Sequence, residues 1–73
     1  MTESLKNFGG RLKALRSEKH VTQKFMSELL GCTVSNYQKI EYGEVNIPIT
    51  SLITLAKYFD VSTDYLLGLK DEK

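Results

Sequence analysis

The chain has 73 residues, of which 26% are charged and 41% hydrophobic, and its formal net charge is +1. We expect a chain of this length to form one small domain with a thin core. Its single Cys cannot form an internal disulfide, and Cys32 with the only His, His20, is too small a set for a zinc site. We therefore expect no metal and no other cofactor, and stability from helix packing, self-association or both.

The N-terminal residues MTESLKNFGG lack the apolar run of a signal peptide, and no stretch resembles a membrane span. A single Cys suits a reducing compartment, so we expect a cytoplasmic protein without membrane contact. Residues 1–40 carry seven Lys/Arg and three Asp/Glu, whereas residues 41–73 carry three and six. The basic half suits contact with a polyanion such as nucleic acid, although small domains often show such an imbalance.

The first predicted element is an amphipathic helix. Phe8, Leu12 and Leu15 are spaced i, i+4, i+7, which indicates a helix over residues 5–18. His20 follows, at a position where a residue in the left-handed conformation would close that helix.

Two short helices are predicted next. Thr22 is a suitable N-cap for a helix that Gly31 ends, with apolar residues Phe25, Met26, Leu29 and Leu30. Thr33 can cap a third helix over residues 34–41, whose core-facing side chains are Tyr37 and Ile40.

The C-terminal half predicts two more helices. The fourth begins either at Pro48 or after Thr50, and its inward residues are Leu52, Leu55, Ala56 and Phe59. Ser62 caps the fifth, which Leu66 and Leu67 bury and Gly68 closes. We expect a single all-α domain over residues 1–73 with a core at about 5–68, and a frayed tail with the sequence KDEK.

The connection between the second and third helices carries the functional signal. Only a few residues around Gly31 separate the two helices, and so short a turn forces a steep crossing. Cys32 suits the role of a small apolar plug in that turn. Residues 22–41 therefore predict a helix-turn-helix, in which the second helix projects and can enter the DNA major groove.

The chain resembles the phage-repressor/Cro-type helix-turn-helix domains of the XRE family over about residues 8–68. This resemblance implies a compact five-helix bundle of the lambda-repressor-like type. It also implies a sequence-specific double-stranded DNA-binding regulator that acts as a repressor and a homodimer. The order and spacing of the matching stretches carry it, and these are RLKALRSEK (11–19), VTQ (21–23), SELLG (27–31), KIEYG (39–43), LITLAKYF (52–59) and VSTDYLLG (61–68).

Site residues follow from the resemblance. It implies a buried ion pair between Arg16 and Glu41. The positions that contact phosphate map to Gln23, Asn36 and Tyr42. The positions that contact bases map to Thr33, Val34, Ser35, Gln38 and Lys39.

The chemistry of these residues fits a role in base recognition. Lys39 can donate to guanine, Gln38 can pair with adenine, and Val34 can contact a thymine methyl group. The alternative is that the same residues form an ordinary solvated helix face.

Several residues depart from the pattern of the family. Ser27 replaces the usual Ala, and Tyr37 replaces a branched aliphatic residue, so its hydroxyl is expected to reach solvent or a phosphate. Phe25 and Leu29 stand where polar residues are usual. They predict either a wider core stripe against the first helix or an exposed patch for a protein partner.

Three other roles remain open beside the repressor. An antitoxin and a restriction-modification controller use the same fold, and a protein-interaction module could leave the recognition helix idle. Leu66 and Leu69 offer a candidate surface for the homodimer.

His20 and Cys32 could in principle form a base and a nucleophile, but they lack a third orienting group. We therefore expect no enzyme activity.

Overall fold

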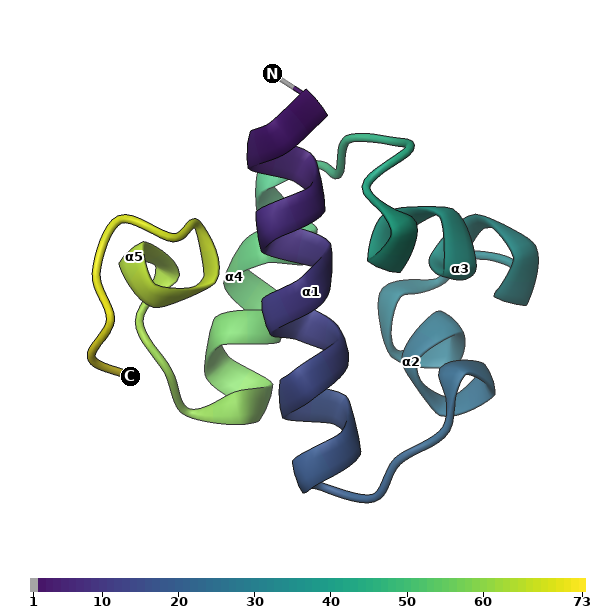
Figure 1. Cartoon of the computed structure of the whole chain (residues 1–73). Coiled ribbons are helices and arrows are strands. Elements are labelled where there is room, and N and C mark those ends of the chain that lie inside the picture. The colour runs from purple at the N-terminus through teal and green to yellow at the C-terminus, as the bar shows by residue number, and fades with distance from the viewer. Residues whose placement is uncertain (1) are drawn as a thin grey trace.

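The computed structural model describes residues 2–73, and all the regular structure in this range is helical. Figure 1 shows α2 and α3 on one side of the central α1, and α5 on the other. The all-α prediction and the predicted number of helices are confirmed. The helices are α1 (Thr2–Glu18), α2 (Gln23–Leu30), α3 (Val34–Tyr42), α4 (Ile49–Phe59) and α5 (Thr63–Leu66).

Side-chain caps begin three helices at the predicted residues. The hydroxyl oxygens of Thr22, Thr33 and Ser62 each accept a hydrogen bond of 3.0 Å from the backbone N–H three residues later. Gly31 and Gly43 end α2 and α3 in the left-handed conformation, at φ 70° and 76°. Glycine adopts these angles without the steric cost of a Cβ atom, so the helices stop where the sequence indicates.

Two helix starts and the C-terminal tail differ from the expectation. α1 begins at Thr2, before residue 5, and α4 begins at Ile49, between the two starts considered. The tail is docked rather than frayed. The N–H of Ser62 donates to the carbonyl oxygen of Lys73 at 2.8 Å, and the Lys73 ammonium lies 3.0 Å from a carboxylate oxygen of Glu18. These contacts pair opposite charges and satisfy a backbone donor.

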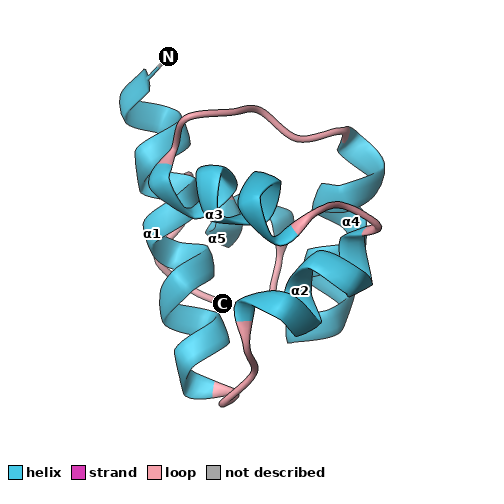
Figure 2. Ribbon diagram, turned by 90° about the vertical axis from the view of Figure 1, so that its right-hand side faces the viewer, coloured by secondary structure: helices cyan, strands magenta, loops and turns pink. Residues whose placement is uncertain are grey.

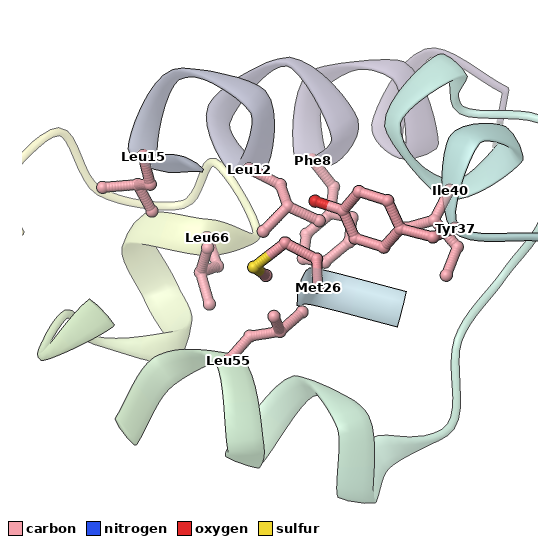
Figure 3. Packing of buried hydrophobic residues seen from close by; sticks show 8 residues of the cluster. All are labelled: Phe8, Leu12, Leu15, Met26, Tyr37, Ile40, Leu55 and Leu66. Atoms are coloured by element: carbon pink, nitrogen blue, oxygen red, sulfur yellow. The ribbon is translucent and has the colours of Figure 1, made fainter. Parts of the chain in front are cut away.

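The hydrophobic core receives at least one side chain from every helix (Figure 3). The inward positions predicted for α1 and α3 are confirmed, and α4 contributes one fully buried leucine to the cluster. The eight buried side chains are Phe8, Leu12, Leu15, Met26, Tyr37, Ile40, Leu55 and Leu66.

Leu66 belongs to this core, so the prediction that it forms part of a dimer surface is wrong. It is 0% exposed, whereas Leu67 is 43% exposed and Leu69 is 72% exposed. Leu67 is the C-cap of α5 and still has helical backbone angles, so its side chain points about 100° away from that of Leu66. The expectation that Leu67 is buried with its neighbour is wrong for the same reason.

The backbones of α1 and α3 approach each other closely at Gly9. Gly9 is buried, and a Cβ atom placed there would lie 2.3 Å from the carbonyl oxygen of Glu41 and 2.7 Å from that of Ile40. Only a hydrogen atom fits in this space. The C-terminal half of α3 is therefore held directly against α1.

Candidate nucleic-acid interface

The turn between α2 and α3 is short and internally bonded. The N–H of Cys32 donates to the carbonyl oxygen of Ser27 at 2.9 Å, next to the left-handed Gly31. Cys32 packs partly buried against the core, as expected for the plug of the turn. Ser27 is 3% exposed, and its hydroxyl donates to the carbonyl oxygen of Lys24 at 2.7 Å. Figure 2 shows this short connection beside the longer one that leads from α3 to α4.

α3 has one buried face and one exposed face. Tyr37, Ile40 and Glu41 point inward, at the spacing of successive helical turns. Gln38 lies half-buried at the edge between the two faces. The other predicted contact residues on or next to α3 are exposed, while their contacts with DNA stay a prediction. The exposed ones at or near α3 are Thr33, Val34, Ser35, Asn36, Lys39 and Tyr42.

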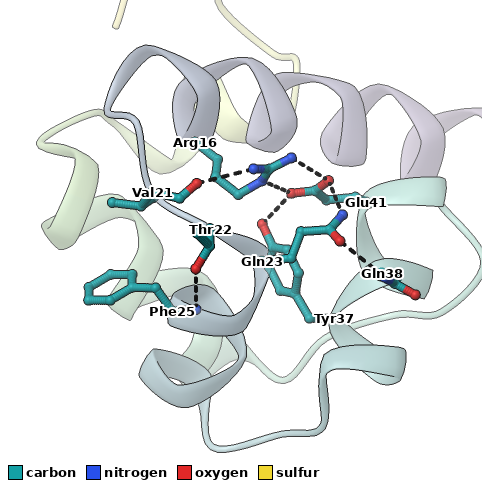
Figure 4. A network of polar contacts seen from close by, with 8 residues as sticks. All are labelled: Arg16, Val21, Thr22, Gln23, Phe25, Tyr37, Gln38 and Glu41. Carbon is teal, nitrogen blue, oxygen red and sulfur yellow. Dashed lines mark hydrogen bonds and ion pairs between the residues drawn. The ribbon is translucent and has the colours of Figure 1, made fainter.

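Beneath this surface, the carboxylate of Glu41 accepts hydrogen bonds from three side chains (Figure 4). Arg16 donates from Nε at 2.6 Å and from Nη2 at 3.4 Å. The Tyr37 hydroxyl donates at 2.6 Å and Gln23 Nε2 at 3.2 Å. Arg16 also donates to the carbonyl oxygen of Val21 at 3.1 Å. The ion pair expected between Arg16 and Glu41 therefore forms, and it links α1 to α3 and, through Gln23, to α2.

The expectation that the Tyr37 hydroxyl reaches solvent or a phosphate is wrong. Tyr37 is 0% exposed, and its hydroxyl is committed to Glu41. Burial raises the pKa of the Tyr37 phenol far above its ordinary value, and the neighbouring carboxylate raises it further. Tyr37 therefore remains a hydrogen-bond donor and serves the interior of the domain.

The same network keeps Glu41 ionised although its side chain is only 1% exposed. Burial opposes the charge, but the hydrogen bonds from Arg16, Tyr37 and Gln23 outweigh it and hold the pKa of the Glu41 carboxyl below its ordinary value of 4.5. An ionised Glu41 has only acceptor oxygens, so every partner must present an N–H or O–H to it.

This shift predicts an acid-sensitive fold. Because the pKa of Glu41 is lower in the folded than in the unfolded chain, its contribution to stability is complete above the unfolded pKa and is lost as the pH falls through the folded pKa. We expect the Tm to hold near neutral pH and to fall below about pH 4. Thermal unfolding followed by circular dichroism from pH 7 to pH 2 measures this. Glu41→Gln should have a lower Tm at pH 7 and a weaker acid dependence; equal acid dependence of both proteins would refute the assignment.

One contact at the interface was not predicted from the sequence. Gln38 Nε2 donates to Gln23 Oε1 at 3.1 Å, although the two residues lie on different helices. Each had been predicted separately as a DNA contact. The only signal for their pairing is that two amides were expected on the same surface, because hydrogen bonds between distant residues leave no periodic pattern.

Phe25 and Leu29, the two apolar residues at usually polar positions of α2, both contact other side chains of the domain. Leu29 is half-buried against the core, and the ring of Phe25 lies 5.5 Å from that of Tyr58, measured between centroids. Tyr58 also carries the Lys19 ammonium 4.3 Å from its ring centroid. Leu29 therefore widens the apolar stripe of α2 as predicted, whereas Phe25 lies outside the core cluster and stacks on Tyr58 of α4. Phe25 is still 39% exposed, and a protein partner at this place stays a prediction.

The lone His and lone Cys lie at opposite ends of α2. His20 takes the left-handed conformation, with φ 58°, in the connection before α2, and Cys32 follows the helix. Eight helical residues span about 12 Å, which separates the two side chains. Across residues 2–73, no three His, Cys, Asp or Glu side chains lie close enough to hold a metal ion. In the same range, no helix has the length and apolar character to cross a membrane.

Comparison with known proteins decides the family. The sequence model of the helix-turn-helix family matches residues 12–66, which include both helices of the motif and most of the surrounding bundle. The chain belongs to the helix-turn-helix family. The resemblance inferred from the sequence is thereby confirmed.

Curated relatives of this helix-turn-helix chain are transcriptional regulators of Bacillus subtilis (strain 168). The uncharacterized HTH-type transcriptional regulator YobD is 37% identical over 62 residues, which cover 85% of this chain and 55% of YobD. The SPbeta prophage-derived regulator YonR, also uncharacterized, is 40% identical over 60 residues, which cover 82% of this chain and 56% of YonR. The chain spans about half the length of these relatives.

A solved structure of similar length shares the fold. The restriction-modification controller protein C.AhdI from Aeromonas hydrophila is 31% identical to this helix-turn-helix chain, with a TM-score of 0.73. The alignment covers 85% of this chain and 94% of C.AhdI. The all-helical fold predicted from the sequence is therefore shared with this restriction-modification controller protein.

Proposed function

We propose that this chain is a sequence-specific double-stranded DNA-binding transcriptional regulator whose α3 enters the major groove. One observation carries the proposal. α3 is anchored by a buried network on its inner face and presents small, polar and basic side chains on its outer face. A rigid helix with a free polar face is what direct reading of base edges requires.

The roles of individual residues form part of this proposal. Lys39 donates to guanine, Gln38 pairs with adenine, and Val34 packs on a thymine methyl group. Thr33 and Ser35 complete the surface that meets base edges. Contacts with phosphate come from Gln23, Asn36 and Tyr42, which position the domain without reading the sequence.

A homodimer is the proposed binding form. One recognition helix covers only a few base pairs, so two copies on an inverted repeat, with half-sites about 34 Å apart, supply the missing specificity. Leu69 remains the candidate from the sequence for the dimer surface, because it is 72% exposed. Ile49 and Leu67 are also exposed, and both line one groove of which Leu69 is not part. They replace Leu66 in the proposed surface.

Regulation by repression is the first proposed outcome, and control of a restriction-modification system is the second. The likeness to C.AhdI, at 31% identity and a TM-score of 0.73, supports the second candidate. Both roles act through DNA binding and need no catalytic step, so we expect no enzyme activity.

The salt dependence of DNA binding tests the proposal against a protein-interaction module with an idle α3. A domain that contacts about four to six phosphates should show a slope of log affinity against log salt of about −3.6 to −5.4. Fluorescence anisotropy with a random duplex pool measures this slope between 50 and 200 mM salt. Absence of binding at the lowest salt by the folded protein would favour the interaction module.

Lys39→Ala should relax base preference at one position of the site. Lys39 is exposed on the outer face of α3 and makes no ion pair within the described residues 2–73, so its removal should cost DNA affinity, about 1–3 kcal/mol, with little effect on stability. Competition binding against operators substituted at each base pair measures the loss. Unchanged preference at every position would remove Lys39 from the reading surface.

A further inference from the structure

Three polar side chains form a line from the buried Glu41 through Gln23 to Gln38 on α3 (Figure 4). Glu41 Oε1 accepts from Gln23 Nε2 at 3.2 Å, and Gln23 Oε1 accepts from Gln38 Nε2 at 3.1 Å. Glu41 is buried, whereas Gln23 and Gln38 are half-exposed. The line thus leads from a buried carboxylate to two amides that both reach solvent in part.

The direction of each hydrogen bond in this line follows from the carboxylate. An ionised Glu41 can only accept, so Gln23 must turn its NH2 group toward it. The carbonyl oxygen of Gln23 is then the atom that faces Gln38, and Gln38 must present its own NH2 group in turn. The orientation of both amides, which is otherwise two-fold ambiguous, is set by one buried charge.

The side-chain amide of Gln38 has one acceptor and one donor left for a ligand. Its carbonyl oxygen and its second N–H make no hydrogen bond within residues 2–73. One donor beside one acceptor in a planar amide matches the N7 acceptor and the N6 donor of adenine. Without the bond to Gln23, the Gln38 side chain would be free to rotate about its single bonds, and holding it at the base edge would cost conformational entropy.

We propose that Gln23 is a positioning residue for base recognition: anchored on Glu41, it fixes the amide of Gln38 in the orientation that selects adenine. This inference rests on the proposed DNA-binding function and adds to it a specificity device. Gln23 keeps one N–H free, so it also contacts phosphate. It therefore contributes to affinity for every sequence and to discrimination at one position.

The first test needs no DNA. In the free protein, the side-chain 15N relaxation of Gln38 Nε2 reports how rigidly the amide is held. Gln23→Ala should increase the mobility of this group, whereas Lys24→Ala, at an exposed neighbouring position of α2, should leave it unchanged. Equal mobility of the Gln38 amide in wild type and Gln23→Ala would overturn the proposal, whether or not the domain binds DNA.

The second test compares Gln23→Ala, Gln38→Ala and the double variant on operators substituted at each base pair. All three should lose about 5- to 100-fold of discrimination at the same A·T pair, and the double variant should lose no more there than Gln38→Ala alone. Gln23→Ala should also weaken binding to all sequences by a common factor. Lys39→Ala should change preference at a different base pair.

Two results would overturn the inference in different ways. If Gln23→Ala lowers affinity uniformly and keeps the wild-type preference, Gln23 contacts phosphate only. If the folded wild-type protein prefers no sequence, the proposed function fails, and the base-reading role of Gln38 with it. Thermal unfolding of each variant shows that it is folded at the assay temperature.

Discussion

Gly9→Ala should lower the free energy of unfolding by about 3 kcal/mol, at the upper end of the usual cost of overpacking. The added methyl group would lie 2.3 Å from the carbonyl oxygen of Glu41, and both helices meet there through backbone atoms that cannot rotate away. α3 would have to move off α1. Denaturation in urea, followed by circular dichroism, measures the change. A domain of this size has about 5–15 kcal/mol of stability, so the effect is large.

Gly10→Ala is the matched control for this prediction. Gly10 is the next residue of the same helix, and a Cβ atom there has no neighbour within 4 Å. Alanine favours the helix over glycine by about 1 kcal/mol, so Gly10→Ala should raise stability. The two variants add the same methyl group to adjacent positions and should change stability in opposite directions. Equal effects would show that α1 and α3 are not in backbone contact.

Glu41→Ala should cost about 3–5 kcal/mol, because it leaves a charged donor without its partner. The Arg16 side chain is 16% exposed and the Tyr37 hydroxyl belongs to a fully buried residue, so water replaces the lost acceptor poorly. Equilibrium denaturation measures the cost. Glu44→Ala is the control, since it removes an exposed carboxylate close in sequence and should change stability by less than about 0.5 kcal/mol.

A double-mutant cycle completes this test. The double variant Arg16→Ala/Glu41→Ala should lose clearly less free energy of unfolding than the sum of the two single variants. It removes both charges, so neither is left buried without its partner. Additive effects, or a Glu41→Ala variant as stable as Glu44→Ala, would mean that the network does not hold α3.

Local features of the fold could be predicted because their causes are local. Thr22 and Thr33 cap the helices that follow them. Gly31 ends α2 in the left-handed conformation, which glycine adopts more easily than any other residue. The inward positions of α1 and α3 follow from helical periodicity alone. The family resemblance supplied the pairing of Arg16 with Glu41, which periodicity does not show.

Features that depend on the packing of distant segments could not be predicted. Tyr37 and Glu41 are four residues apart on α3, a spacing that permits their contact, but only the packing of α1 and α2 around them turns the Tyr37 hydroxyl inward instead of toward solvent. The burial of Leu66 depends on how α5 meets the rest of the bundle. The bond between Gln23 and Gln38 requires α2 and α3 to be placed first. Because of these contacts, Gln23 and Gln38 are joined by hydrogen bonds to each other and to the buried Glu41 instead of acting as separate contact residues.

Selection of bound sequences from a random pool of double-stranded DNA shows whether α3 reads DNA. We expect an enriched inverted repeat with half-sites one helical turn, about 34 Å, apart, and with an A·T pair whose selection depends on both Gln38 and Gln23. A folded wild-type protein that enriches no sequence above background, at low as well as physiological salt, would contradict the claim that α3 reads DNA.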